Sequence, residues 1–474
     1  MTSITTSNVT SAFIDLATFD EIEKYLYGGP DATAYFVRET RKSTWFSQVP
    51  VALSKASGQP AFGQEWAVSI SRAGDYLLQT WLRCQIPQVQ LIAPTIVPAV
   101  GTGVATTTGG NQFGVNGRIR WTRNLMHNII RECNITFNDL VAARFDNYHL
   151  DFWAAFTVPA GKQCGYNNMI GNIDSLINPG SCLNTLPAAT LNLPLPFFYS
   201  RDSGVALPTA ALPYNEMRIN FSFRDWTELL ILEDVSNLKE QRTTPNAPID
   251  IQIAPTLGQT QVWGNYAIVS NDERKRMACA PRDVLIEQVQ TAPRQTYAPQ
   301  TNQAPSYDIR FSHAIKVLFF SVRNKTFKAE WSNYMTSSPV SISTKTDFKP
   351  LSSADPILQT TLVYENTSRL SSMGSDYFSL VNPWYNAPVI PKDTGYHTYS
   401  YSLDFISLDP MGSTNYGKLT NVSIVPEASN AAIQAASGSG SSGSNFPQNY
   451  EFIVTAVNNN IIRISGGALG FPVL

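Results

Sequence analysis

The residues best suited to chemistry in this 474-residue chain stand in one short stretch, "PLPFFYSRDSGVALP", at positions 194–208. Ser200 and Ser203 lie beside Arg201 and Asp202 in an otherwise apolar, proline-rich frame. A serine nucleophile needs a base to accept its proton, but the stretch holds no histidine and the chain has no G-x-S-x-G. Because a base would have to come from a distant segment, the stretch predicts a structural turn rather than a reactive loop.

The same residues have an ordinary structural interpretation. Asp202 and Ser203 favour a turn through side-chain-to-backbone hydrogen bonds, and Gly204 can supply a positive φ. Arg201 and Asp202 are expected to fix the loop or a subunit contact. On this hypothesis Ser203→Ala is tolerated, whereas Gly204→Val impairs folding or assembly. The residues predicted to set the fold are Pro194, Phe197, Phe198, Arg201, Asp202, Gly204, Pro208, Pro213 and Tyr214.

Other signatures of catalysis or ligand binding are weak. Four histidines form no H-x-x-x-H and no C-x-x-C occurs, so a zinc site would need distant residues. The stretch "GTGVATTTGG" lacks G-x-G-x-x-G spacing, and no G-x-x-x-x-G-K-[ST] occurs. Five widely spaced cysteines predict free thiols. We expect no catalytic residue, no cofactor and no metal.

The composition narrows the classes of partner. The net charge of −2 gives no basic excess, so direct binding to nucleic acid is not expected. No apolar run reaches about 18 residues, and the first residues lack the basic start and apolar run of a signal peptide. Charged residues make up 15% of the chain, against about 25% in an average soluble protein. A surface so poor in charge favours contact with copies of the chain or with partners.

The elements that must position these residues are mostly strands. "NEMRINFSF" (215–223) alternates apolar and polar residues, which is typical of a half-buried strand. Residues 72–75 look like the turn of a hairpin. Short helices are predicted after Thr18, over 137–156, within 223–235 and within 271–283. Strands that recur at short intervals indicate antiparallel sandwiches.

The chain has two similar parts, each with strand pairs, a loop-rich middle and closing strands. Gly-, Ser- and Thr-rich inserts at 97–117 and 429–445 interrupt one part each and are expected to be mobile surface loops. The predicted division is 1–29, an N-terminal arm with a short helix; 30–225, a first domain; 226–250, a linker with room for a short helix; and 251–474, a second domain.

Longer stretches carry a more specific similarity. "LPLPFFYSRDSGVALPTAALPYNEMRINFSF" (193–223) resembles the signature of the major capsid proteins of large icosahedral DNA viruses. "LVYENTSRL", "MGSDYFSLVNPWY", "DPMGSTNYGKLTN" and the tail "NNNIIRISGGALGFPVL" are similar to the iridovirus major capsid protein, above all in the iridescent viruses of invertebrates. The resemblance covers nearly the whole chain, and Ala12 departs from it where relatives tend to have glycine.

The resemblance implies an all-β fold of two consecutive eight-stranded antiparallel jelly rolls with a few short helices. It implies a homotrimer of pseudo-hexagonal outline, the capsomer, that tiles the icosahedral capsid of a double-stranded DNA virus. The implied partners are neighbouring capsomers and minor capsid proteins on the inner face, close to an internal viral membrane. The implied location is the outer capsid of the virion, after assembly in the host cytoplasm.

Three points stay open in the sequence. The inserts are candidates for outward loops of the capsid. The segment through Gly29 is either an arm on the inner or lateral side or a helix packed on its own first domain. The alternative function is a double jelly-roll glycan-binding or glycan-cleaving protein, which an acidic pair in a concave pocket would favour.

Overall fold

The computed structural model describes residues 2–18, 36, 43–97, 106–237, 242–301, 304–336, 355–438 and 447–472. The chain forms two units, Met1–Trp45 and Phe46–Leu474. In the first unit the described helix is α1 (Thr2–Ala17), which leaves Val9, Phe13 and Leu16 exposed. The helix predicted after Thr18 lies outside the described residues.

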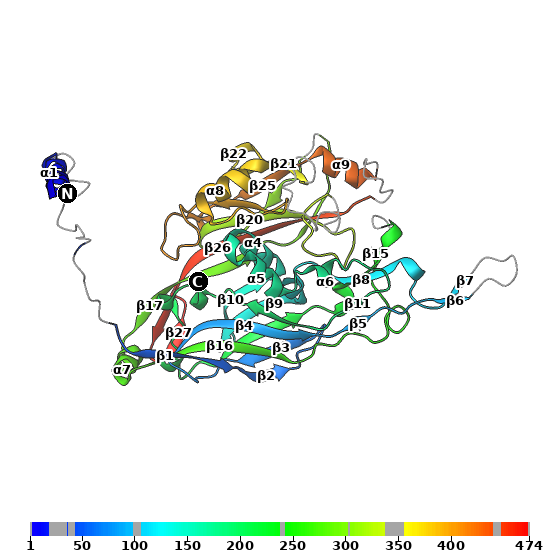
Figure 1. The fold of residues 1–474 in the computed structure, drawn as a ribbon, viewed down its shortest axis with the longest axis horizontal. Coiled ribbons are helices and arrows are strands. Elements are labelled where there is room, and N and C mark those ends of the chain that lie inside the picture. Colours follow the sequence, from blue (N-terminus) through cyan, green and yellow to red (C-terminus); the bar gives the residue numbers. More distant parts are fainter. Residues whose placement is uncertain are drawn as a thin grey trace. The chain divides into compact units, whose positions relative to one another are not determined.

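Two sheets form the first half of the larger unit (Figure 1). One has the order β1 (Phe46–Ala52), β16 (Thr260–Val269), β4 (Tyr76–Ile86) and β12 (Ala189–Pro194). The other has the order β10 (Leu140–Asp146), β9 (Ile130–Phe137), β13 (Met217–Phe223), β3 (Glu65–Ser69) and β2 (Ser54–Gly58). All pairs are antiparallel.

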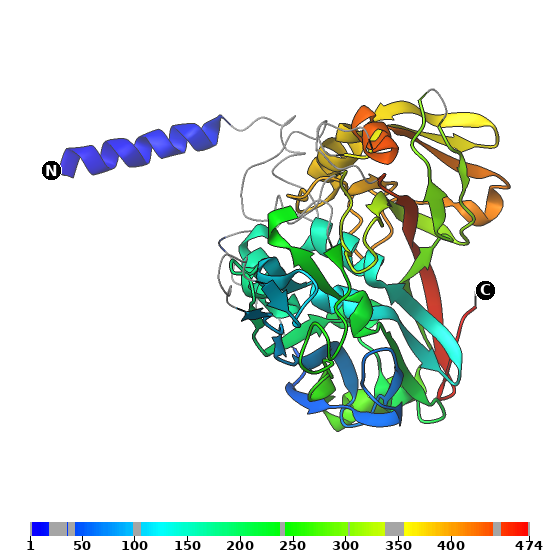
Figure 2. The same cartoon turned by 90° about the vertical axis from the view of Figure 1, so that its right-hand side faces the viewer.

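The second half, which contains the yellow, orange and red elements in Figure 2, repeats this strand order. Its first sheet runs β17 (Arg282–Thr291), β26 (Tyr450–Ser465), β20 (Ala314–Asn324) and β23 (His397–Ser400). Its second sheet runs β19 (Tyr307–Asp308), β25 (Val422–Ala428), β21 (Ile357–Tyr364) and β22 (Thr367–Gly374). In both halves the first strand therefore pairs with the last, and the last lies beside a long strand, β4 or β20.

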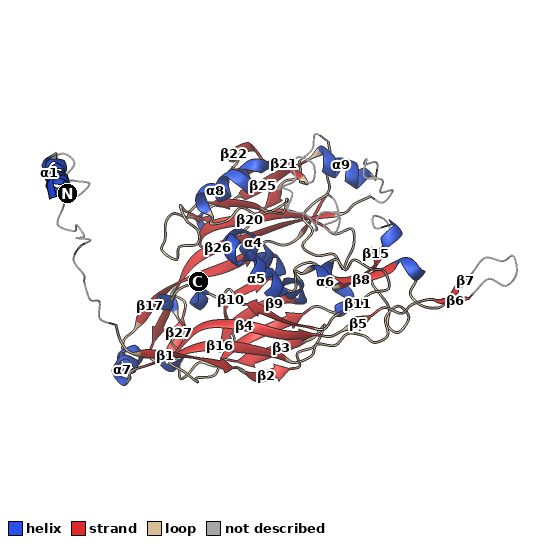
Figure 3. Ribbon diagram, viewed as in Figure 1, coloured by secondary structure: helices blue, strands red, loops and turns tan. Residues whose placement is uncertain are grey.

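Smaller elements complete the larger unit, in which strands outweigh helices (Figure 3). A third sheet of the first half has the order β15 (Arg242–Thr243), β14 (Leu230–Asp234) and β8 (Gly117–Trp121). The other short strands are β5 (Val89–Gln90), β6 (Thr95–Val97), β7 (Thr106–Thr108), β11 (Thr185–Leu186), β18 (Gln295–Tyr297), β24 (Thr414–Asn415) and β27 (Ala468–Gly470). The helices are α3 (Leu125–Ile129), α4 (Asn147–Thr157), α5 (Ala160–Ile170), α6 (Asp174–Ile177), α7 (Asn271–Cys279), α8 (Asn382–Asn386) and α9 (Asn430–Ser437).

The helix predicted over 137–156 is wrong in its first part. Asn138 and Asp139 take positive φ values of 49° and 66° and turn the chain from β9 into β10. The helix α4 begins only after Asp146, whose side chain accepts a hydrogen bond from the His149 backbone N–H at 3.0 Å. Asp is a favoured helix cap because its side chain satisfies an otherwise unpaired N–H. The apolar spacing over 137–156 therefore belongs to a strand in its first part and to a helix in its second part.

The hairpin predicted at 72–75 is also wrong, because β3 and β4 belong to different sheets and the turn crosses between them. The Asp75 side chain instead ties β4 to β16 and α7, accepting hydrogen bonds from Val269 N and Arg274. The helix predicted within 223–235 is a single turn, Trp226–Glu228, followed by β14. By contrast, the alternating strand at 217–223 and a helix within 271–283 are confirmed.

The structure adds detail on the two inserts and on the boundary between the two domains. The 429–445 insert begins as helix α9, and the 97–117 insert includes β7, so neither is loop throughout. Strand β16 follows residue 250, after which the second domain is predicted to begin, yet it pairs with β1 and β4 of the first half.

All five cysteines are free. No helix among the described residues is long and apolar enough to cross a membrane.

The sheet that contains β20 is buried on both faces. Val317 and Phe319 belong to a core that they share with the first half. Leu318 and Phe320 point to the opposite face, into a core built from the second half alone. Since alternate residues of a strand point to opposite faces, one sheet serves two cores and attaches the halves to each other.

Candidate functional site

The two halves of the larger unit contact each other in a region that we call the junction. It comprises the loop 194–214 and helix α4 of the first half, with strands β17, β20, β26 and β27 of the second. Figure 1 shows α4 between β20 and β26 on one side and strands of the first half on the other. The stretch singled out in the sequence therefore lies in the junction.

An ion pair connects the loop to the second half. Arg201 Nη2 lies 2.5 Å from Glu287 Oε2 on β17, and Glu287 Oε1 lies 2.5 Å from Lys316 Nζ on β20. The guanidinium of Arg201 also lies 3.8 Å from the ring centroid of Trp153 on α4. The Lys316 and Glu287 side chains are buried, and Arg201 is nearly so. Two cations therefore share one buried carboxylate across the junction.

Replacing Arg201 by alanine is expected to lower the free energy of unfolding by about 2 kcal/mol, because a buried ion pair and a cation–π contact are lost. The loss stays moderate since Glu287 keeps Lys316. Urea denaturation measures it. Arg463→Ala is the control: this arginine pairs with Asp283 at 2.7 Å, but both side chains are more than half exposed. Equal effects of the two substitutions would contradict the junction role of Arg201.

Apolar contacts surround this ion pair. A small cavity in the junction is lined by Phe198, Val205, Ala206, Leu207 and Pro208 of the loop and by Val284, Ile462, Ile464 and Leu469 of the second half. Phe197 is buried, stacks on Tyr199 at a centroid distance of 5.7 Å and meets the ring of Phe145 at a tilt, 5.2 Å away. Tyr214 is 77% exposed but lies against Gly467, where an added Cβ would come within 2.8 Å of the tyrosine ring.

The remaining predicted residues lie at the rim of the loop. Pro194 ends β12 opposite Trp81, and Pro213 lies beside the turn at Gly467. Asp202 is exposed and accepts a hydrogen bond from Ser203 N at 2.7 Å, as a turn-forming aspartate does. The positive φ expected at Gly204 is absent. Gly204 is exposed, and an added Cβ would meet only Asp202 Oδ2, at 3.5 Å. The structure thus gives no reason for Gly204→Val to impair folding.

Helix α4 supplies an aromatic contact that the sequence did not reveal. Phe152, Trp153 and Phe156 surround Phe319 of β20 at centroid distances of 5.8, 6.5 and 5.5 Å. Phe152 also meets Tyr334 of the second half at 5.7 Å. An amphipathic stripe was visible in the sequence, but its partner lies more than 150 residues further along the chain.

A buried charge cluster forms a second tie between the halves. Glu233 on β14 is fully buried and accepts hydrogen bonds from Arg118 Nε at 2.8 Å and Arg120 Nε at 3.0 Å. Arg120 also lies 3.4 Å from Glu330, which belongs to the second half. Arg242 pairs with Glu330 at 2.5 Å and lies 3.7 Å from Glu233. Three arginines and two glutamates thus neutralise most of one another's charge.

Two histidine clusters could suggest catalysis, but their geometry does not support it. Ser375 Oγ and Asp355 Oδ2 both approach Nε2 of His397, at 2.6 and 2.9 Å. In a catalytic triad the serine and the aspartate use different ring nitrogens. All three side chains are buried, so no substrate could reach the serine. This cluster therefore fills the interior of the second half.

The second cluster lies in the junction. The ring of His127 bridges Asp151 Oδ1, 2.7 Å from Nδ1, and the Tyr166 hydroxyl, 2.6 Å from Nε2. Asp151 Oδ2 accepts hydrogen bonds from Ser332 and Tyr334 of the second half at 2.6 and 2.8 Å. The carboxylate therefore holds both halves through buried hydrogen bonds. Among the described residues, no three His, Cys, Asp or Glu side chains gather as they would around a metal ion.

A third histidine makes the fold sensitive to acid. Burial, together with the nearby charge of Arg201, lowers the pKa of His149 to about 3. The unfolded chain takes up this proton near pH 6.5, whereas the native state does not. The stability due to neutral His149 is therefore complete above about pH 6.5 and is lost as the pH falls towards 3.

Between about pH 7 and about pH 5, this group alone is expected to lower the free energy of unfolding by about 2 kcal/mol. His149→Phe should remove that part of the pH dependence, since its ring neighbours are Phe145 and Trp153. Urea denaturation of both proteins at the two pH values measures the difference. An identical pH dependence in the variant would count against this assignment.

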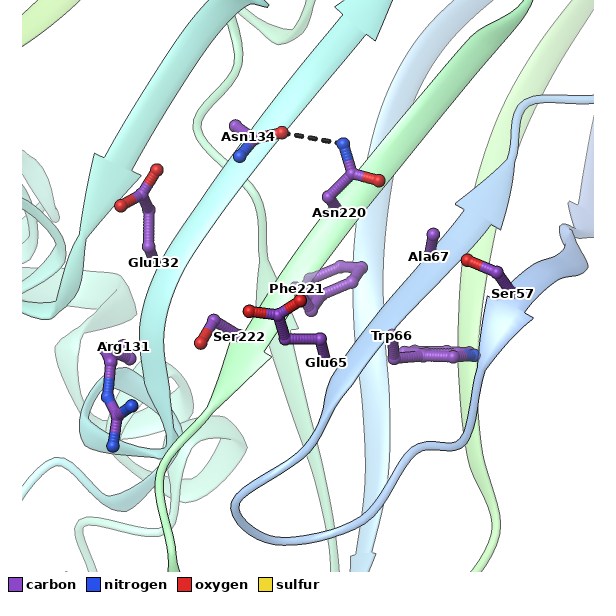
Figure 4. A pocket seen from close by; sticks show the side chains of 10 residues that line it. All are labelled: Ser57, Glu65, Trp66, Ala67, Arg131, Glu132, Asn134, Asn220, Phe221 and Ser222. Atoms are coloured by element: carbon purple, nitrogen blue, oxygen red, sulfur yellow. Dashed lines mark hydrogen bonds between the residues drawn. The ribbon is translucent and has the colours of Figure 1, made fainter. Parts of the chain in front are cut away.

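A hollow of about 380 Å³ lies on the outer face of the sheet β9–β13–β3 (Figure 4). Glu132 and Glu65 flank Ser222 on neighbouring strands, so an acidic pair does stand at a concave surface. A sugar site also needs an exposed aromatic ring to stack on. Trp66 lines the hollow, but it is 6% exposed and packs on Phe221 at 5.5 Å. The hollow is therefore a polar surface without a platform for a sugar ring.

Comparison with known proteins gives a consistent result along the whole chain. A family model described as "Major capsid protein N-terminus" matches residues 34–269, and one described as "Large eukaryotic DNA virus major capsid protein" matches residues 273–470. The major capsid proteins of Costelytra zealandica iridescent virus and Invertebrate iridescent virus 6 are each 66% identical to this chain over the full length of both chains. That of Lymphocystis disease virus 1 is 51% identical, again over both full lengths.

Solved structures agree with the fold. A PBCV-1 capsid model matches 93% of this chain and 100% of its own with a TM-score of 0.68 and 18% identity. The Faustovirus major capsid protein matches 92% of this chain and 93% of its own with a TM-score of 0.64 and 13% identity. At such identities the likeness shows the fold alone, a double jelly roll.

Proposed function

The chain belongs to the family of major capsid proteins of large eukaryotic DNA viruses, with iridescent-virus relatives at 66% identity, and from this premise we propose that three copies form one capsomer. It is a structural protein of the virus shell and not an enzyme. The observation that carries the proposal is the repeated strand order of the two halves. Two similar blocks per chain give six per trimer, which fits a pseudo-hexagonal outline.

The two domains are proposed to be eight-stranded jelly rolls with additional short strands. We place the change of domain between β16 and β17, after the boundary at 250 expected from the sequence, because β16 pairs with β1 and β4. The motif residues at 194–214 are proposed to act as fold-setting contacts of the junction. A junction that fixes two blocks in one orientation makes each chain a rigid unit for a regular lattice.

Further partners follow from this role. Neighbouring capsomers are proposed to bind laterally, through contacts that are individually weak and gain strength from multivalency. Minor capsid proteins are proposed to bind the inner face, close to an internal membrane, with assembly in the host cytoplasm. No direct contact with nucleic acid is proposed, in keeping with the net charge of −2. The glycan-directed alternative is not carried forward, since the hollow lacks an exposed aromatic ring.

Size-exclusion chromatography with light scattering tests the trimer. The expected mass is three times the chain mass of 52.3 kDa. A strictly monomeric protein at all concentrations and salt conditions would overturn the proposal. Electron microscopy of the same fractions should show particles of hexagonal outline, and round or elongated particles would contradict the pseudo-hexagonal arrangement.

A further inference from the structure

Each half has a helix in the same connection between its two sheets. In each half a connection leads from an edge strand of one sheet, β10 or β22, to an edge strand of the other, β12 or β23. Each connection begins with a helix directly after the strand: α4 from residue 147, and a helical run over 375–386 that includes α8. The two helices are therefore equivalents in the repeated fold.

The helix α4 shows what such a helix does. Trp153 and Phe156 stand six and nine residues after its first residue, Asn147, and both pack on Phe319 of β20. Their side chains cover the outer face of the first sheet of the second half. A helix of the first block thus attaches the block that follows it.

The second helix also carries large apolar residues, and no part of the chain that the structure describes covers them. Val381 ends a π-helical turn, Tyr377–Val381, and Trp384 lies in α8, which follows it directly. They are 42% and 70% exposed, and the adjacent Tyr385 is 76% exposed. Large apolar side chains gathered in one exposed group usually mark a contact surface.

The first half offers the matching surface. Its sheet β1–β16–β4–β12 has the strand order of the sheet that α4 covers, with β4 in the place of β20. On its outer face, Trp81 of β4 and Trp263 of β16 stand directly opposite each other, with centroids 6.4 Å apart and nearly parallel rings. Both rings are partly exposed, and the exposed polar residues Gln79 and Arg83 lie along the same face of β4. An apolar centre with a polar rim is the usual anatomy of a protein interface.

We propose that the helix 375–386 of one copy packs its Trp384 face on the Trp81–Trp263 face of the next copy. The contact would repeat between copies what α4 does within one chain. It is a head-to-tail contact, which closes a ring of three when each copy supplies one helix and one sheet face. The six blocks of the capsomer are then joined by six similar contacts, three within chains and three between them. This inference rests on the proposed trimer and names its interface.

The test is the mass in solution of three variants beside the wild-type chain. Trp384→Glu and Trp81→Glu each place a charge in the contact from opposite sides, and both should convert the trimer into monomers. Leu403→Glu is the control, because Leu403 is 77% exposed in the second half, outside both surfaces, and should leave the trimer intact. Circular dichroism should give each variant the wild-type spectrum, since Trp384 is largely exposed in the single chain.

The outcomes separate this inference from the proposed function. A wild-type trimer with monomeric, folded Trp384→Glu and Trp81→Glu supports both. If the wild type is a trimer and either variant stays one, the interface is elsewhere and the inference fails while the capsomer proposal stands. If the wild type is a monomer, the capsomer proposal fails first. Should Trp384→Glu lose its fold, Trp384→Ala replaces it, and an undiminished trimer with alanine overturns the inference.

Discussion

Replacing Glu233 by glutamine is expected to lower the free energy of unfolding by about 3–5 kcal/mol. The side chain is fully buried and faces Arg118, Arg120 and Arg242. Burial by itself would raise the pKa of Glu233, but the three arginines outweigh it and lower the pKa. Without this carboxylate, the one acidic partner left to the buried Arg120 among the described residues is Glu330, at 3.4 Å. An uncompensated buried charge is among the most destabilising changes in a protein interior.

Urea denaturation near neutral pH measures this loss. Asp283→Asn is the matched control, because it also removes a carboxylate paired with arginine, but at a site where both side chains are about half exposed. The control should change stability far less. If Glu233→Gln and Asp283→Asn had the same small effect, the buried cluster would not be the tie between the halves that its geometry indicates.

Replacing Phe152 by alanine is the second change with a large expected effect, about 3–5 kcal/mol. Phe152 is fully buried and contacts Phe319, Tyr334 and Tyr396, all in the second half. A cavity at this point weakens the packing between the two halves more than it weakens the core within either half. Scanning calorimetry should therefore resolve two unfolding transitions in the variant where the wild-type protein has one.

Phe221→Ala separates loss of packing from loss of coupling. Phe221 is equally well buried, but its ring neighbours Trp66 and Phe223 belong to the first half. It should lower stability to a similar extent without splitting the transition. A single transition in both variants would mean that Phe152 is an ordinary core residue.

Local sequence pattern predicted the strands well and their partners poorly. The strand at 217–223 and the helix α7 were readable because apolar alternation and an acidic first turn are local signals. The sequence predicted a turn at 72–75 correctly. The sheet to which the next strand, β4, belongs depends on its pairing with β16, nearly 200 residues away in the sequence. The resemblance to capsid proteins, carried by long motifs, supplied the double jelly roll that periodicity alone left as two sandwiches.

For the same reason, the sequence revealed only some of the residues that form the junction. The stretch around Arg201 was correctly seen as structural, but its partner Glu287 lies 86 positions further along and no local pattern marks it. Arg118 and Arg120 look like surface charges on a strand, yet β8 is buried along its whole length and they face Glu233. No local pattern in the sequence shows that Trp384 is 70% exposed in the single chain.

The position of β26 has a consequence for synthesis of the protein. This strand lies in the middle of its sheet, between β17 and β20, and so that sheet of the second half stays incomplete until the ribosome has made residues 450–465. Until then the aromatic face of α4 has no sheet to cover. A product that stops before β26 therefore has an incomplete second block and cannot form the pair of blocks that a shell needs. The strand order thus acts as a check on synthesis, because only chains that include β26 have the complete second block that a virus particle needs.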